Sequence, residues 1–120
     1  MIDDEVQISM TLDIKVQQII QEIVEKLEKE YKPAKIILFG SYADGHPDQD
    51  SDIDFLIIKD TPERPIDRRV AASRIVSDPK RLIPFESLVL TPQEVGERLD
   101  SGDLFLKEIL KKGKVLYEAR

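Results

Sequence analysis

The sequence contains no cysteine and only one histidine among its 120 residues. Without cysteine there can be no disulfide bond and no metal centre held by thiolates. Apolar runs fall well short of the ~20 residues that a transmembrane helix needs, and the acidic start is unlike a signal peptide, so we expect a cytoplasmic protein without membrane association. Basic residues are outnumbered by acidic ones, 18 to 24. The net charge of −6 argues against nucleic acid as the main partner, although a nucleotide accompanied by a cation remains compatible with it.

The chain length suits one domain, residues 1–120, built around one hydrophobic core. No internal repeat, low-complexity segment or interdomain linker interrupts it. Apolar residues at helical or strand spacing, together with turn and capping signals, predict an α/β fold: a short mixed sheet with helices mainly on one face. The expected helices cover residues 13–31, 66–77, 92–99 and a segment ending at 112, and the expected strands lie at 35–39, 53–58, within 82–90 and at 115–117.

The most informative segment is FGSYADGHPDQDSDIDFLII, residues 39–58. Gly40 and Ser41 follow one β-prone apolar run, and Asp52 and Asp54 open the next. Gly40 allows close backbone approach, and Ser41 offers a hydroxyl and an N–H to phosphate. Alternate residues of a strand point to one face, so Asp52 and Asp54 should project together.

Two neighbouring carboxylates repel each other by roughly 4 kcal/mol at about 4 Å and an effective dielectric near 20. A bound cation between them would offset that cost. Because the ligands are all oxygen, they favour Mg²⁺, or Mn²⁺, with phosphate oxygens completing the coordination. The segment therefore predicts a site for a metal-bound phosphate ester.

Simpler interpretations exist for each half of this pattern. A calcium loop beginning at Asp48 would place Ile53 where glycine is required and Lys59 where a bidentate glutamate is required, so we reject it. The segment 48–51 is best explained as a solvated turn. Gly40 and Ser41 alone would suit an ordinary strand-to-helix turn with Ser41 as N-cap.

The Gly-Ser turn followed by Ser51-Asp52-Ile53-Asp54 resembles the signature of the minimal nucleotidyltransferases of the DNA polymerase β superfamily. The resemblance covers roughly residues 14–117. It implies a polymerase-β-like fold in which two aspartates and a carboxylate on a later strand bind two Mg²⁺ ions. It also implies that Gly40 and Ser41 bind the nucleoside triphosphate.

Glu86 is the candidate for the third carboxylate, since it lies in an apolar run just before Thr91-Pro92. The family usually has aspartate there, and the alternative is that Glu86 is an exposed strand residue. Asp44 is a second departure, because the family often has an arginine at this position that could meet phosphate. Lone His46 is more typical of an exposed loop residue than of a base or ligand. Arginines cluster at Arg64, Arg68, Arg69 and Arg74; we expect them to be exposed and paired with acidic neighbours, with acceptor or phosphate contact as the alternative.

The resemblance implies transfer of a nucleoside monophosphate, AMP from ATP, to a hydroxyl acceptor. No segment that could build a separate substrate domain is expected after the core. Family members of this size often act as antitoxins that pair with a helical HEPN-domain toxin and transfer AMP to its tyrosine. The predicted catalytic and metal-binding residues are Asp52, Asp54 and Glu86, and the predicted nucleotide-binding residues are Gly40 and Ser41. A non-catalytic antitoxin that neutralises its HEPN partner by contact, or a small-molecule nucleotidyltransferase, remain alternatives.

Overall fold

The computed structural model describes residues 4–120, with side chains described from residue 14 onward. The elements run in the order α1 (Asp4–Glu30), β1 (Lys35–Phe39), α2 (Ser41–Asp44), β2 (Ile53–Ile58), α3 (Pro65–Val76), β3 (Phe85–Leu90), α4 (Pro92–Asp100), α5 (Leu104–Lys112) and β4 (Lys114–Glu118). The predicted α/β class is confirmed. None of the described helices is both long and apolar enough to cross a membrane.

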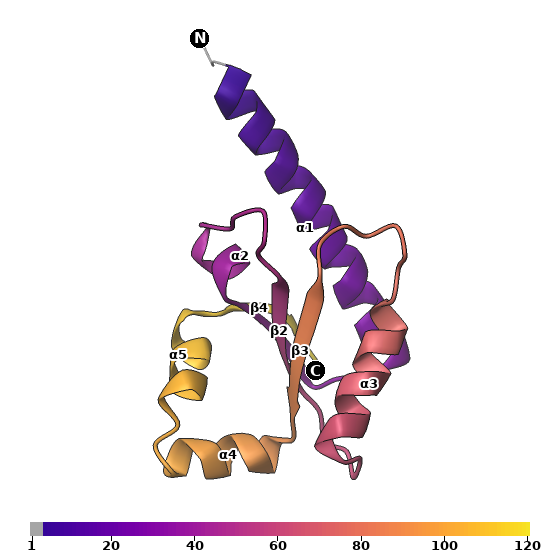
Figure 1. Ribbon diagram of the computed structural model, residues 1–120. Coiled ribbons are helices and arrows are strands. Elements are labelled where there is room, and N and C mark those ends of the chain that lie inside the picture. Colours follow the sequence, from indigo (N-terminus) through magenta and orange to yellow (C-terminus); the bar gives the residue numbers. More distant parts are fainter. Residues whose placement is uncertain (1–3) are drawn as a thin grey trace.

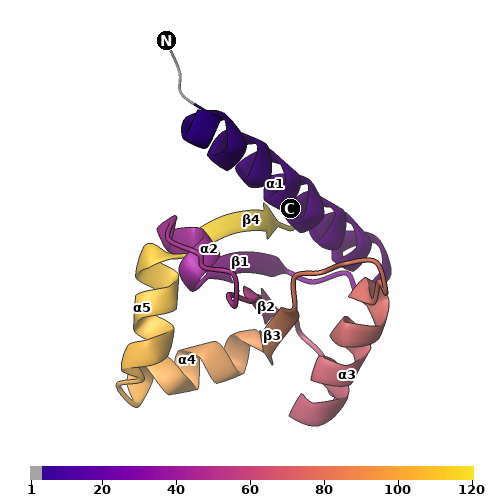
Figure 2. The ribbon, with the colours of Figure 1, turned by 45° about the horizontal axis from the view of Figure 1, so that its top comes forward.

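The four strands form one mixed sheet in the order β3-β2-β1-β4. Strand β1 pairs antiparallel with both β2 and β4, whereas β2 and β3 are parallel. Because parallel neighbours need a crossover, α3 connects β2 to β3. Helices α1 and α3 lie on one side of the sheet, and the shorter α4 and α5 lie on the other (Figures 1 and 2).

Strand alternation divides the core into two layers. The larger layer joins α1 and α3 to the strand residues Ile36, Leu38, Ile53, Phe55, Ile57 and Val89. Leu106 and Ile109 of α5 pack on the opposite face, against Ile37, Leu56 and Leu90. Phe55 is completely buried and meets Phe85 edge-on, with ring centroids 5.2 Å apart. Buried apolar area on both faces fixes the register of β2, because a slip of one residue would exchange its two faces.

Helix α1 begins earlier than the sequence suggested. Its apolar stripe begins near Val16, and the prediction therefore began at residue 13, whereas the helix already starts at Asp4. Once a helix is nucleated, each further residue adds a backbone hydrogen bond, so a helix can extend beyond its packed stripe. The N-terminal part of α1 projects away from the sheet (Figure 1).

Arg68 corrects the expectation that the arginines are exposed, because it is only 6% exposed. Its guanidinium donates to the carbonyl oxygens of Glu63 (2.7 Å) and Val89 (3.4 Å) and to Glu94 Oε1 (2.6 Å). Glu94 also accepts from the backbone N–H of Thr91, in the predicted capping box of α4. One arginine thereby ties α3, β3 and α4 together.

Candidate active site

The turn after β1 has a conformation that only glycine readily adopts. Gly40 has φ 76° and ψ −157°, in a region essentially closed to residues with a β-carbon. Its carbonyl oxygen accepts hydrogen bonds from the N–H groups of Ala43 and Asp44, both 3.0 Å. Gly40 is therefore the N-cap of the short α2, and Ser41 is its first residue. The explanation of Ser41 as an N-cap is wrong.

Gly40 lies directly against the second aspartate of the motif. Strand pairing puts Phe39 opposite Asp54, so the turn emerges beside the Asp54 side chain. A β-carbon built on Gly40 would lie 2.5 Å from Asp54 Oδ2, closer than any real contact of this kind. The absence of a side chain at residue 40 thus leaves space for the carboxylate. The two halves of the sequence motif, 12 residues apart from Gly40 to Asp52 in the printed sequence, meet at one edge of the sheet.

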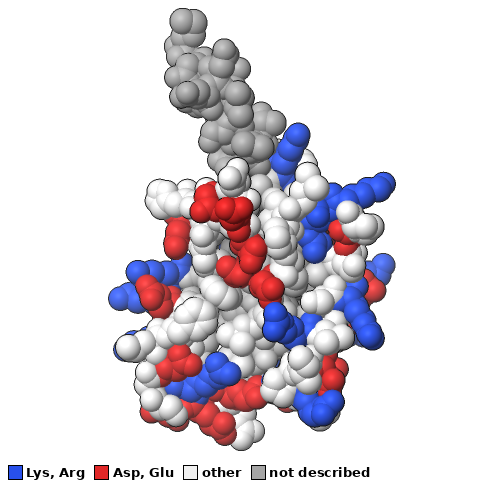
Figure 3. All heavy atoms as spheres, viewed as in Figure 1, with Lys and Arg blue, Asp and Glu red and all other residues white. Residues whose placement is uncertain are grey.

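The three predicted carboxylates come from neighbouring strands. Asp52 immediately precedes β2, Asp54 lies within it, and the parallel register pairs Asp54 with Glu86 of β3. Ile53 and Phe55 are buried on the opposite face, so Asp54 lies on the face toward α4 and α5, as the strand alternation predicted. Acidic side chains gather on the face seen in Figure 3, over the end of β2 and toward β3.

Burial is the main factor that raises the pKa of Asp54, and the charges of Asp52 and Glu86 raise it further. Desolvation and like charges both disfavour the ionised form, so the arrangement is electrostatically unfavourable without a cation. The oxygen-only donor set and the space left by Gly40 fit a hard divalent ion such as Mg²⁺. The donor chemistry of Asp52 and Asp54 therefore fits the metal that the sequence implies, whereas the third carboxylate, Glu86, is bonded elsewhere.

The side chain of Glu86 has a different partner from the one predicted. Its Oε2 accepts a hydrogen bond from Arg69 Nη2 of α3 at 2.9 Å, and both side chains are at least half exposed. Within the described side chains, no three carboxylates or imidazoles converge closely enough to hold an ion together. The sheet brings the Glu86 backbone beside Asp54, while the Glu86 carboxylate is directed to Arg69.

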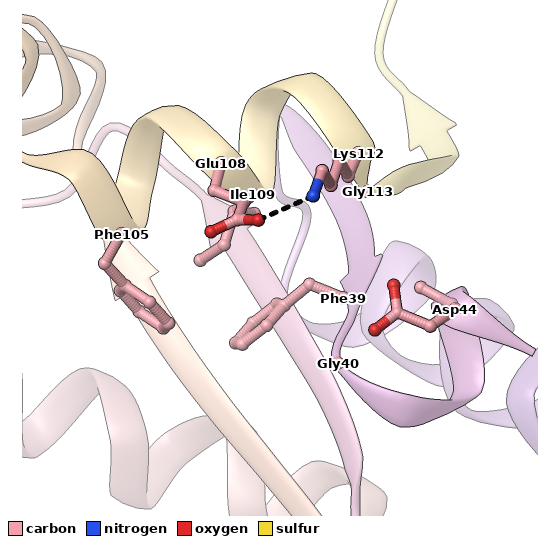
Figure 4. Close-up of a pocket in the computed structure, with 9 residues that line it drawn as sticks. Phe39, Gly40, Asp44, Phe105, Glu108, Ile109, Lys112 and Gly113 are labelled. Carbon is pink, nitrogen blue, oxygen red and sulfur yellow. Dashed lines mark hydrogen bonds and ion pairs between the residues drawn. The ribbon is translucent and has the colours of Figure 1, made fainter. Parts of the chain in front are cut away.

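A cleft of about 280 Å³ opens on the other side of Gly40. Figure 4 shows Phe39, Gly40 and Asp44 along one wall and residues of α5 along the other. The α5 wall contributes Phe105, Glu108, Ile109 and Lys112. No sequence pattern groups these α5 residues with the Gly-Ser turn, since Phe105 and Ile109 recur at ordinary helical spacing.

Charges also face one another across this cleft. Lys112 donates to Glu108 Oε1 at 2.8 Å within α5. That hydrogen bond and the charge of Glu108 raise the pKa of Lys112, and Asp44 on the opposite wall adds a smaller effect in the same direction. Asp44, where the resembled family often has an arginine, therefore interacts electrostatically with Lys112 across the cleft. His46 is exposed in the following turn, as expected.

Comparison with known proteins finds a matching family, a similar sequence and a similar fold. The family described as "Polymerase beta, Nucleotidyltransferase" matches residues 21–120. A curated relative, the "putative protein adenylyltransferase" of Methanocaldococcus jannaschii, is 32% identical over 103 residues, which cover 82% of this chain and 94% of that protein. The crystal structure of a "putative nucleotidyltransferase" from Sulfolobus solfataricus superposes with a TM-score of 0.63 at 21% identity, covering 91% of this chain and 86% of the other. At that identity the structural likeness shows the fold alone.

Proposed function

The chain belongs to the polymerase β nucleotidyltransferase family, and we propose that it transfers AMP from ATP to a hydroxyl group in a reaction that depends on Mg²⁺. The observation that carries this proposal is the close approach of Gly40 to the Asp54 carboxylate, which brings the Gly-Ser turn, the proposed phosphate-binding element, next to a proposed metal ligand. In the reaction, the acceptor oxygen forms a bond to the α-phosphorus, the bond from that phosphorus to the bridging oxygen breaks, and pyrophosphate leaves.

We assign the metal-binding role to Asp52, Asp54 and Glu86, with Mn²⁺ as a possible substitute for Mg²⁺. Two such ions would stabilise the attacking and the leaving oxygen in this class of displacement. Gly40 and the Ser41 backbone and hydroxyl would orient the triphosphate, so that its α-phosphorus lies close to Asp54. Glu86 on β3 lies on the side of Asp54 away from Gly40, and it would face the acceptor and take up the proton of the acceptor hydroxyl group.

The contact between Arg69 and Glu86 defines what must change before transfer. Glu86 has to leave Arg69 Nη2 and turn toward Asp54, its register partner on β2. Because this ion pair is exposed, breaking it costs about 0–1 kcal/mol. A bound divalent ion can readily compensate a cost of that size.

For the acceptor, we propose a tyrosine of a HEPN-domain toxin, which would make the chain an antitoxin. The name of the Methanocaldococcus jannaschii relative, a protein adenylyltransferase, supports a protein acceptor. The contact-only alternative is favoured by two observations: Asp44 in place of a cation, and the bond between Glu86 and Arg69. Transfer to a small molecule is the remaining alternative.

The decisive experiment combines the protein, Mg²⁺, each labelled nucleoside triphosphate and the product of the adjacent reading frame, followed by intact-mass analysis. We expect the partner to gain the mass of AMP when ATP is supplied. A double variant, Asp52→Asn with Asp54→Asn, is the control and should give no mass gain. If the partner is neutralised without any mass gain, the protein acts by contact. If the partner is neither modified nor neutralised, the acceptor assignment is wrong.

A further inference from the structure

The cleft beside Gly40 lies on the nucleotide side of the proposed site. Across the sheet the order is Glu86 on β3, Asp54 on β2 and Phe39 on β1, followed by Gly40. The cleft borders Phe39 and Gly40, and neither Asp52 nor Glu86 lines it. Because Gly40 and Ser41 are the proposed triphosphate-binding residues, a nucleotide bound at this turn has the cleft directly next to it.

The size and apolar surface of the cleft suit a flat ring. Its volume of about 280 Å³ is near the lower end of the ~300–1,000 Å³ usual for small-molecule sites, so it can hold part of a nucleotide. Phe39 and Phe105 meet edge-on with centroids 5.8 Å apart and an interplanar angle of 85°. Phe105 remains 58% exposed, which leaves much of its ring free to contact a ligand.

The polar groups of the cleft supply hydrogen-bond acceptors from both walls. Asp44 extends from α2 and Glu108 from α5, so a ring between them would meet a carboxylate on each side (Figure 4). Ionised carboxylates only accept hydrogen bonds. They therefore favour a ring that carries an amino group over one that carries a carbonyl at the same position, because two acceptors facing each other leave both unpaired. Lys112, bound to Glu108, is the one cationic donor among the lining residues.

We propose that this cleft is the nucleobase subsite, that Phe105 contacts the base, and that Asp44 and Glu108 select bases with an exocyclic amino group. This inference rests on the proposed nucleotidyl transfer, since it concerns the other end of the same substrate. It also gives Asp44 a role: a residue unsuited to phosphate is suited to an amino group.

The first test separates base contact from phosphate contact. Binding of Mg²⁺–ATP and of Mg²⁺–tripolyphosphate, which has no base, is measured by calorimetry for the wild type, Phe105→Ala and Leu104→Ala. Loss of base–aromatic contact should weaken ATP binding by about tenfold in Phe105→Ala, while tripolyphosphate binding stays the same. Leu104 is the matched control, because it is the neighbouring α5 residue, is 77% exposed and does not line the cleft.

The second test addresses selection of the amino group. ATP and inosine triphosphate differ at the 6-position, amino in one and carbonyl in the other, so wild-type protein should bind ATP several-fold more tightly. Asp44→Asn and Glu108→Gln keep the side-chain shape but add a donor. At least one of them should reduce that preference severalfold, while tripolyphosphate affinity is unchanged.

The outcomes distinguish this inference from the proposed function. If ATP and tripolyphosphate bind with Mg²⁺ but Phe105→Ala behaves like Leu104→Ala, the base lies elsewhere and the subsite is wrong while nucleotide binding stands. Equal affinity for ATP and inosine triphosphate in the wild type overturns the amino-group selection. If neither ATP nor tripolyphosphate binds with Mg²⁺, both the proposed function and the nucleobase subsite are wrong.

Discussion

Substituting Gly40 by alanine tests whether the Gly-Ser turn and the aspartate pair form one site. The new β-carbon would lie 2.5 Å from Asp54 Oδ2, whereas an ordinary contact needs at least 3.4 Å. The carboxylate must therefore move by about 1 Å, and a displacement of that size can cost ~10²-fold in rate. We expect Gly40→Ala to lower nucleotidyl transfer by about two orders of magnitude.

Backbone strain accompanies this substitution and needs its own control. Gly45 also has a positive φ, 82°, but nothing lies within 4 Å of a β-carbon built there. Gly45→Ala should therefore show the left-handed backbone penalty of about 1–2 kcal/mol without displacing Asp54. Melting temperatures report the backbone strain, which should be larger at Gly40, with ψ −157°, than at Gly45, with ψ 12°. Mg²⁺-dependent ATP binding reports the displacement of Asp54, expected at about 10–100-fold for a disturbed metal ligand.

The reasoning is refuted if folded Gly40→Ala binds Mg²⁺–ATP as tightly as the wild type. It is equally refuted if Gly45→Ala weakens that binding to the same degree, because the loss would then come from the strained turn and not from Asp54.

Three further predictions concern the residues around the site. Thr91 and Arg68 hold the pKa of Glu94 below its usual range, so the ionised form of Glu94 contributes stability above the unfolded-state pKa of about 4.5. The melting temperature of Glu94→Gln should therefore lie below that of the wild type at neutral pH, and the difference should vanish as the pH falls through the depressed pKa. A difference that does not depend on pH contradicts the assignment. Arg68→Met should lower the free energy of unfolding in urea by about 2–4 kcal/mol, because it leaves the carboxylate of Glu94 and a strand carbonyl without their partner. The control Arg64→Met, at an exposed ion pair, should lower it by under 1 kcal/mol. Equal losses would show that burial of Arg68 is unimportant. Glu86→Gln should leave Mg²⁺–ATP binding nearly intact and reduce transfer by orders of magnitude, since its contact is made mainly in the transition state; a wild-type transfer rate would place the third carboxylate elsewhere.

Local pattern predicted the strands and the placement of the motif well. The alternation of Ile53 and Phe55 with Asp54 determines which face each side chain occupies, and that face follows from the sequence because an inverted strand would bury carboxylates. The capping box at Thr91 could also be predicted from the sequence, since both of its hydrogen bonds join residues three positions apart.

The features that were missed depend on residues far apart in the chain. Burial of Arg68 requires Glu94, which is 26 positions away, and no local pattern reveals such a partner. The cleft arises because α5 returns across the sheet toward Gly40, bringing Phe105 near Phe39. The bond between Arg69 and Glu86 likewise depends on where α3 docks beside β3.

The mixed sheet has a consequence for the order in which the molecule folds. Phe39 and Asp54, which pair between β1 and β2, are only 15 positions apart in the chain. Glu86 comes 32 positions after Asp54 and reaches it only when the α3 crossover has closed. Because short loops close at lower entropic cost and local contacts form faster, a nucleus on the β1–β2 pair would bring Gly40 to Asp54 early. Mutations in β3 would then mainly accelerate unfolding, and the acceptor side would be the last part of the catalytic centre to form.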